Sequence, residues 1–281
     1  MIAIIYLENI MRIELYPNGI PAKCAEDDFV PYLDTFLLDA AKTPLGAVLV
    51  LPGGGYHHRA PHEGDPVARR FNDLGYHAFV LQYRVQPSTA PAPQLDVVRA
   101  LKIIRANAEK WYIQPDKIAV CGFSAGGHLA GCAGMIADRY IVEQGDEADS
   151  FSGKADAMIL AYGVLSVNML FHDRGRPHPG TPYCDENDNP IELVQMVNEN
   201  TPPAFVWHTA ADLSVKVESS VLFAQNMWKN HRPCELHIYP DGHHGRGLGL
   251  GFSDIISWSS EAAVFLETHC NFRRGAYSKH Y

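Results

Sequence analysis

A serine surrounded by glycines lies near the middle of the chain. Residues 119–131 read AVCGFSAGGHLAG, and Gly122, Ser124 and Gly126 match the G-x-S-x-G pattern of a nucleophile elbow. In this motif a strand turns abruptly into a helix with the serine at the tip, and a side chain on either flank would collide with those elements. The amides that begin the following helix favour negative charge beside the serine. The pattern predicts a nucleophile at Ser124.

A second glycine cluster, in the stretch LPGGGYHHRAPHEG, follows an apolar run. Backbone N–H groups with no side chain between them can face the oxyanion of a tetrahedral intermediate. We therefore expect Gly54 and Gly55, together with Ala125, to donate to an oxyanion hole. A flexible glycine turn is the alternative interpretation. The nucleophile elbow two strands later favours the oxyanion hole.

A nucleophilic serine also requires a base, and an acid that orients it, in the chain order Ser, Asp, His. Asp212 follows the apolar run AFVWHT and is predicted at the carboxyl end of a strand, where parallel sheets build their sites. Asp241 is the weaker alternative, because it is too near the histidine in sequence to reach its far nitrogen. His243 and His244 both qualify as the base. We prefer His244, although position alone does not decide between them.

The elements that must position these residues alternate along the chain. Helical patterns in residues 94–111 and 255–265 place apolar side chains at steps of three and four. Short apolar or β-branched runs between turn residues predict strands at 46–52, 77–83, 117–122, 157–163, 204–209 and 235–240. Most of these runs are apolar throughout, as in a sheet that is covered on both faces. The prediction is an α/β fold, with a mostly parallel central sheet and helices on both faces.

Two regions depart from this alternation. The turn signal Tyr16-Pro17-Asn18-Gly19, within the first forty or so residues, predicts an antiparallel start to the sheet. Residues 164–203 are rich in His, Pro, Asp and Asn and are too long for an ordinary connection, which indicates a cap or lid over a site. A disordered surface excursion is the alternative. We expect a single domain over residues 1–281 with this insertion.

Composition excludes several classes of protein. The 281 residues are 47% hydrophobic, which is enough for a substantial core, and the formal net charge of −9 argues against a nucleic-acid partner. The first sixteen residues carry no basic region and are interrupted by Glu8 and Arg12. They fit neither a signal peptide nor a membrane span. We therefore expect a soluble, cytoplasmic protein with no membrane partner.

Neither cysteine nor histidine spacing predicts a metal site. The six cysteines have no CxxC spacing and are expected to be buried thiols. His57, His58 and His62 include an i, i+4 pair, but Pro61 disfavours a continuous helix there and no glutamate lies between His58 and His62. His128 and His208 have apolar neighbours, so they are expected to be packed or hydrogen-bonded.

Five ordered motifs resemble those of a known family. They are PGGGY (52–56), QYRV (82–85), GFSAGGHLA (122–130), PPAFVWHTAADLSV (202–215) and YPDGHHGRGL (239–248). Together they are similar to the α/β-hydrolase esterases and lipases, in the acetyl-xylan-esterase-like branch near the hormone-sensitive-lipase group. The resemblance covers roughly residues 30–269. The family's usual oxyanion-hole motif His-Gly-Gly-Gly begins with Pro52 here, a variant that this branch shares. Lys216 stands where the family often has a proline, after the valine that follows the triad aspartate.

The resemblance implies that Ser124 is the nucleophile, Asp212 the triad acid and His244 the base, the last because the family pattern reads Gly-x-His-Gly. It implies an α/β-hydrolase fold and a serine carboxylesterase that acts on small acyl esters through an acyl-enzyme. Acetyl is the favoured acyl group, and a carbohydrate is a candidate alcohol.

On this reading the partner is a small-molecule ester, and no metal or other cofactor is expected. The insertion would supply the alcohol side of the pocket, with His172, His178 and Tyr183 as candidate sugar contacts. A homo-oligomer is left open. The alternatives are a serine peptidase of the same fold and a non-catalytic binding protein on this scaffold.

Overall fold

The computed structural model describes residues 10–38, 43–172, 175, 177–178 and 180–275. One eight-stranded sheet runs through the molecule in the order β1-β2-β4-β3-β5-β6-β7-β8. The strands are β1 (Arg12–Glu14), β2 (Tyr32–Phe36), β3 (Leu45–Leu51), β4 (His77–Gln82), β5 (Ile113–Phe123), β6 (Ala157–Ala161), β7 (Ala204–Thr209) and β8 (Cys234–Tyr239). The α-helices are α1 (Asp65–Asp73), α2 (Ala92–Ala106), α3 (Ala125–Met135), α4 (Val167–Phe171), α5 (Leu193–Met196), α6 (Glu218–Lys229) and α7 (Trp258–Cys270).

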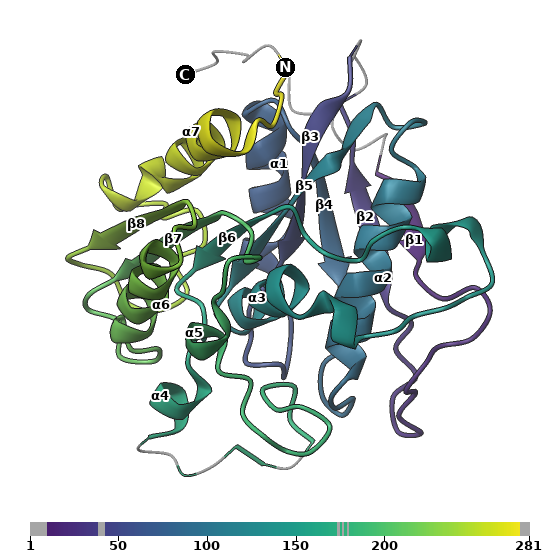
Figure 1. Cartoon of the computed structure of the whole chain (residues 1–281), viewed down its shortest axis with the longest axis horizontal. Coiled ribbons are helices and arrows are strands. Elements are labelled where there is room, and N and C mark those ends of the chain that lie inside the picture. Colours follow the sequence, from purple (N-terminus) through teal and green to yellow (C-terminus); the bar gives the residue numbers. More distant parts are fainter. Residues whose placement is uncertain (1–9, 39–42, 173–174, 176, 179, 276–281) are drawn as a thin grey trace.

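The direction of the strands confirms the predicted fold class. β1 and β2 pair antiparallel, and β2 is antiparallel to β4, whereas β3 to β8 run parallel to one another. Helices α2, α3 and α6 cover one face of the sheet, and α1 and α7 cover the other (Figure 1). The carboxyl ends of β3, β5, β6, β7 and β8 therefore lie along one edge.

The strands form where the apolar runs predicted them, because both faces of the sheet are covered. Every residue of β3, β6 and β7 is buried. β5 begins earlier than the apolar pattern indicated, since Ile113 pairs with Leu45 before a register shift in the ladder. β8 is an edge strand that pairs with β7, and most of its residues are only partly buried.

Helix α2 buries the apolar stripe that its sequence predicted, with Val97, Leu101 and Ile104 fully buried. The apolar periodicity continues beyond the end of the helix at Ala106. There the Ile103 carbonyl accepts both the Asn107 N–H at 3.2 Å and the Asn107 side chain at 2.9 Å, so Asn107 closes the last turn of the helix.

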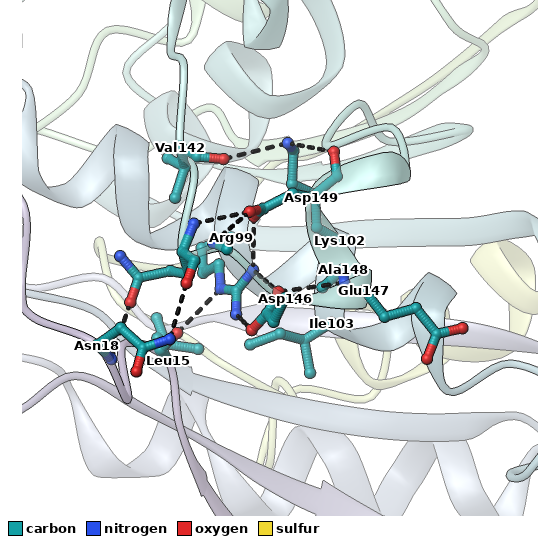
Figure 2. Close-up of polar contacts among 12 residues, drawn as sticks. Leu15, Asn18, Arg99, Lys102, Ile103, Val142, Asp146, Glu147, Ala148 and Asp149 are labelled. Carbon is teal, nitrogen blue, oxygen red and sulfur yellow. Dashed lines mark hydrogen bonds and ion pairs between the residues drawn. The ribbon is translucent and has the colours of Figure 1, made fainter.

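A buried arginine of α2 ties the N-terminal part of the chain to the loop that follows α3 (Figure 2). Arg99 forms ion pairs with Asp146 and Asp149 and donates to the Leu15 carbonyl at 2.9 Å. Asn18 completes the link, because its side chain donates to the Gln144 carbonyl at 2.7 Å. These contacts lie over α2, away from the sheet edge where the predicted site residues meet.

The segment 164–203 connects β6 to β7 and contains α4 and α5. Within its described part, Ile191 and Leu193 are buried in the core that covers one face of the sheet. A Cβ atom on Gly131 of α3 would lie 2.4 Å from Leu193 Cδ1, so this part of the segment packs closely on the helix. Residues 173–174, 176 and 179, and the N-terminal residues 1–9, lie outside the described residues.

All six cysteines are free thiols, of which Cys24 and Cys234 are partly exposed and the other four are buried. Among the described residues, no helix is long and apolar enough to cross a membrane.

Candidate active site

The carboxyl edge of the parallel strands gathers the predicted site residues. Ser124 directly follows β5 and Tyr162 directly follows β6. Asp212 and His244 lie in the loops after β7 and β8, and the glycine triplet 53–55 follows β3. Because parallel strands share one carboxyl edge, five segments distant in sequence meet there.

The backbone at Ser124 adopts the strained turn that an elbow requires. Its φ of 53° and ψ of −116° are unfavourable for a residue with a side chain. Bonds on both sides of the residue hold the turn. The Ser124 N–H donates to the Ala161 carbonyl at 3.0 Å, and the Ser124 carbonyl accepts from the N–H groups of Gly127 and Val164 at 3.0 and 3.1 Å.

Two glycines permit the crowding around this serine. A Cβ atom on Gly122 would lie 2.0 Å from the Gly126 carbonyl oxygen. A Cβ atom on Gly126 would lie 2.1 Å from the carbonyl oxygen of Leu51, at the end of β3. Neither distance is compatible with a side chain. The collision expected from the sequence is therefore a collision with backbone, which cannot rotate away.

Three side chains form a continuous hydrogen-bonded chain at the elbow. Ser124 Oγ lies 2.8 Å from His244 Nε2, and His244 Nδ1 lies 2.6 Å from Asp212 Oδ2. The other carboxylate oxygen of Asp212 accepts from the backbone N–H groups of Ser214 and Val215 at 2.7 and 3.0 Å. The imidazole is thus held between a hydroxyl and a carboxylate that is fixed by its own loop.

The two alternatives left open by the sequence lie elsewhere. His243 is exposed, and its Nδ1 lies 2.7 Å from the His244 carbonyl oxygen rather than near the serine. Asp241 is exposed and forms no hydrogen bond with His244 among the described residues. The structure therefore brings together Ser124, His244 and Asp212.

Asp212 has a second imidazole partner that the sequence did not identify as part of the site. His208 Nε2 lies 3.2 Å from Asp212 Oδ2, and both side chains are fully buried. The expectation that His208 is packed or hydrogen-bonded is confirmed. Burial would raise the pKa of Asp212, but the hydrogen bonds from His208, His244 and the Val215 N–H outweigh it and hold that pKa well below its usual value. Asp212 is therefore a carboxylate near neutral pH.

The glycine triplet passes directly against the elbow. A Cβ atom on Gly53 would lie 3.0 Å from Ser124 Cβ and 2.7 Å from the Phe123 carbonyl oxygen. Gly54 and Gly55 both have positive φ angles, 128° and 65°. A residue with a Cβ would be strained at either position, so the loop needs glycine for its path as well as for its closeness to the serine.

The carbonyl groups of this loop are turned back into the loop itself. The Gly53 carbonyl accepts from the Ala60 N–H, and the Gly54 carbonyl accepts from the His57 N–H, each at 2.9 Å. In a trans peptide the N–H points opposite to the carbonyl of the same unit. The N–H groups of Gly54 and Gly55 therefore point away from the side of the loop on which the Gly53 and Gly54 carbonyls are bound.

In the described part of the chain, the amides of Gly54, Gly55 and Ala125 donate no hydrogen bond to another residue. All three predicted donors thus remain available beside the serine.

A cavity of about 510 Å³ opens at this point. It is lined by Ser124, His244, Gly54 and Gly55, and by residues of the segment 164–203, among them Phe171 and Tyr183.

Of the candidate sugar contacts, Tyr183 lines the Ser124 cavity, whereas His172 lines a neighbouring cavity. His178 is not among the described residues that line either one.

The remaining histidines near the site have other surroundings. His57, His58 and His62 line the cavity. Among the residues that the structure describes, no group of three or more His, Cys, Asp and Glu side chains is arranged to hold a metal ion. His128 is fully buried and its Nδ1 lies 2.9 Å from the Tyr56 hydroxyl, which confirms the expected hydrogen-bonded histidine.

Glu63 and Tyr162 are two further buried polar residues at this edge that the sequence analysis missed. Glu63 is 2% exposed and Tyr162 is 1% exposed. Tyr162 lies near the carboxyl end of the predicted strand 157–163, and that position, similar to the signal that located Asp212, could have identified it. The loop sequence around Glu63 carries no comparable signal.

Known proteins resemble this chain in sequence and in structure. Residues 33–227 match the BD-FAE family. Endo-1,4-beta-xylanase B of Butyrivibrio fibrisolvens is 35% identical over 223 residues, which are 77% of this chain and 35% of that protein. The acetylxylan esterase of Xylanibacter ruminicola is 28% identical over 75% of this chain and 43% of its own length. The chain thus spans less than half the length of these two relatives.

A solved structure supports the same assignment. The acetyl ester-xyloside bifunctional hydrolase from Caldicellulosiruptor lactoaceticus superimposes with a TM-score of 0.81 at 37% identity, covering 93% of this chain and 97% of that chain. The family match extends over more than half of the sequence. This protein therefore belongs to the BD-FAE family, within the α/β-hydrolase esterases and lipases that its motifs resemble.

Proposed function

We propose that this chain is a serine carboxylesterase that removes small acyl groups, with Ser124 as nucleophile, His244 as base and Asp212 as the acid that orients the base. One observation carries the proposal. A single line of hydrogen bonds, 2.8 and 2.6 Å long, joins the Ser124 hydroxyl through both nitrogens of His244 to Asp212. This is the arrangement in which a neutral imidazole can accept a hydroxyl proton while a carboxylate stabilises the resulting cation.

The reaction follows from the geometry in two steps. His244 Nε2 takes the Ser124 proton as Oγ attacks the ester carbonyl carbon, and the oxyanion lies against the amides of Gly54, Gly55 and Ala125. The intermediate expels the alcohol, which receives the proton from His244, and an acyl-enzyme remains. A water molecule activated by His244 then releases the acid and restores the serine. Each hole donor would lower the barrier by roughly 3 to 4 kcal/mol.

For the substrate we propose acetyl esters of carbohydrates. One relative is named an acetylxylan esterase, and the similar solved structure is named an acetyl ester-xyloside bifunctional hydrolase. The segment 164–203 contributes Phe171 and Tyr183 to the cavity wall, so we assign it the alcohol side of the substrate and retain its role as a cap. Contact of His172 or His178 with a sugar stays a prediction, because His172 lines the neighbouring cavity and His178 is not among the described residues that line either one.

The direct test uses purified enzyme with acetylated xylo-oligosaccharides and with nitrophenyl esters of increasing acyl length. We expect the shortest acyl chain to be hydrolysed fastest. Ser124→Ala should lower turnover on the order of a millionfold and abolish labelling by a fluorophosphonate. Ser150→Ala, outside the cavity, serves as the control. A mild loss in the Ser124 variant would assign the reaction to another nucleophile.

The same assay separates the two other functions. A serine peptidase of this fold would cleave aminoacyl-proline amides faster than aryl acetates, which would reject the esterase. A binding protein on this scaffold would give no adduct on Ser124 in the folded state.

These assays do not address three further points. Two are the expectations of a single domain and of a cytoplasmic location, and the third is whether the chain forms a homo-oligomer. Limited proteolysis, cell fractionation and sedimentation would test them in turn.

A further inference from the structure

Glu63 is a buried carboxylate that the proposed reaction does not use. It ends a short 3₁₀ turn, Pro61–Glu63, and lines the cavity that holds Ser124. Its Oε2 accepts from the Gly53 N–H at 2.8 Å, and its Oε1 accepts from the Tyr162 hydroxyl at 2.6 Å. A buried charge is costly unless it is hydrogen-bonded, and here each oxygen has its own donor. The first donor belongs to the glycine triplet of the proposed oxyanion hole.

Tyr162 carries the second contact to the loop of the proposed base. Its hydroxyl donates to Glu63 and accepts from the Gly247 N–H at 2.8 Å. Its ring meets the His244 ring edge to face, with centroids 5.0 Å apart. Burial, and then the adjacent Glu63 carboxylate, raise the pKa of Tyr162 well above its usual value, so the phenol keeps the proton that it donates.

The same short turn contacts the histidine loop at a second point. His62 Nε2 lies 3.0 Å from the Gly245 carbonyl oxygen, next to His244 in sequence. The far side of the loop is held by Trp258, whose indole N–H donates to the Gly247 carbonyl at 3.0 Å. The loop residues that follow His244 are therefore bound to the turn at 61–63 on one side and to α7 on the other.

We propose that Glu63 is a positioning residue, whose two oxygens fix the glycine triplet and, through Tyr162, the His244 loop in a single geometry. This inference rests on the proposed function of the site. Its physical basis is that the hole donors and the base come from separate loops, after β3 and after β8, yet must face the same carbonyl carbon. A misplacement of about 1 Å in such a constellation can cost about 100-fold in rate. One carboxylate bonded to both loops prevents this relative movement.

A structural role alone must be separated from positioning, and the chain offers a matched control. Asp156 directly precedes β6, at the opposite edge of the sheet. Its Oδ2 also accepts one side chain and one backbone amide, from Arg105 at 2.7 Å and from the Ile118 N–H at 2.9 Å. Asp156→Asn, the counterpart of Glu63→Gln, thus removes the charge and weakens a similar set of bonds in the fold without touching the site.

The experiment compares Glu63→Ala, Glu63→Gln, Tyr162→Phe and Asp156→Asn with the wild type. Turnover of 4-nitrophenyl acetate is measured per active site, with sites counted by complete fluorophosphonate labelling. We expect Glu63→Ala to lower kcat by about 10- to 100-fold with little change in KM. Glu63→Gln should retain more activity, because its amide oxygen can still accept one of the two bonds.

Tyr162→Phe should lower kcat less than Glu63→Ala does, since it breaks only the link to the histidine loop. The double variant Glu63→Ala/Tyr162→Phe should lose less than the product of the single losses, because both changes break one connection. Asp156→Asn should lower the unfolding midpoint and leave kcat per site unchanged.

A readout that needs no activity distinguishes failure of this inference from failure of the proposed function. The proton between His244 Nδ1 and Asp212 should give a low-field NMR signal in the wild type and in Asp156→Asn, and the signal should be lost or broadened in Glu63→Ala. An unchanged signal together with an unchanged kcat per site in Glu63→Ala would overturn the positioning role. If the wild type hydrolyses no ester, the proposed function fails, and the NMR comparison still decides the role of Glu63.

Discussion

His208 Nε2 lies 3.2 Å from Asp212 Oδ2, the same carboxylate oxygen that His244 Nδ1 approaches to 2.6 Å. Two imidazoles therefore share one oxygen. The Val215 carbonyl oxygen also lies 3.1 Å from His208 Nε2. Because both of these neighbours are acceptors, Nε2 must carry a hydrogen and donate. The hydrogen bond from His208 thus holds the carboxylate from behind while His244 binds it from the side of the serine.

Replacing His208 should lower the activity of the esterase. The hydrogen bond from His208 is one of the causes that lower the pKa of Asp212. His208→Phe removes this donor, while the hydrogen bonds from His244 and the Val215 N–H remain and keep Asp212 ionised near neutral pH. The carboxylate is then held less firmly beside His244. We expect kcat/KM for 4-nitrophenyl acetate at neutral pH to fall about tenfold, close to the value of one hydrogen bond to a charged group.

The control for this prediction is His208→Gln, whose side-chain amide can donate to Asp212 in place of Nε2. It should keep most of the wild-type kcat/KM. An unchanged kcat/KM in His208→Phe would mean that His208 only fills space behind the carboxylate.

The sequence predicted those parts of the site that depend on local pattern. The G-x-S-x-G pattern after a predicted strand located Ser124, and the place after another predicted strand located Asp212. Parallel strands bring such ends together. The identities of the neighbours were not predictable. Glu63 and Tyr162 are far apart in sequence, and they meet because β3 and β6 both flank β5 in the sheet. Only the strand order creates that contact.

The adjacent histidines were ambiguous for a related physical reason. A loop of glycines can present either imidazole to the sheet edge, and the choice is made by contacts from other segments. His62 and Tyr162 bind the loop at Gly245 and Gly247. These contacts come from the loop after β3 and the end of β6. They could not be predicted from residues 241–249 alone.

Exchange of each adjacent histidine tests this assignment. His244→Ala removes the imidazole beside Ser124 and should lower kcat by roughly 10⁴- to 10⁶-fold, the range for a lost triad member. His243→Ala removes an exposed ring whose Nδ1 faces the His244 carbonyl, and should change kcat by only a few fold. Steady-state kinetics on 4-nitrophenyl acetate measures both. The reverse ranking would make His243 the base.

The steric role of glycine at the elbow predicts a loss of stability. Gly126→Ala would place a methyl group 2.1 Å from the Leu51 carbonyl oxygen, so the elbow or β3 must move. We expect a loss of about 3 kcal/mol or more in the free energy of unfolding, at the upper end for overpacking. Urea unfolding followed by circular dichroism measures it. Gly275→Ala, where the added carbon would meet its nearest atom at 3.5 Å, is the matched control and should change stability far less.

Acid should destabilise the fold partly through His77, which lies at the start of β4. Burial lowers its pKa to about 4, and its Nδ1 accepts the Leu38 N–H at 3.1 Å, so protonation there would break a hydrogen bond. Between the ordinary histidine pKa and this lowered value the unfolded chain binds more protons than the folded one. Stability is therefore fully present above that window and falls as the pH drops through it, by up to about 1.4 kcal/mol per pH unit.

His77→Asn tests this contribution, because its amide oxygen can accept the Leu38 N–H without titrating. Urea midpoints of wild type and variant are compared across a series from neutral pH to about pH 4.5. The wild type should lose stability more steeply than the variant as the pH falls. Burial also lowers the pKa of His128, to about 3. Because His128 is present in both proteins, stability should still fall somewhat with pH in the variant. Parallel curves for the two proteins would show that His77 contributes nothing to acid unfolding.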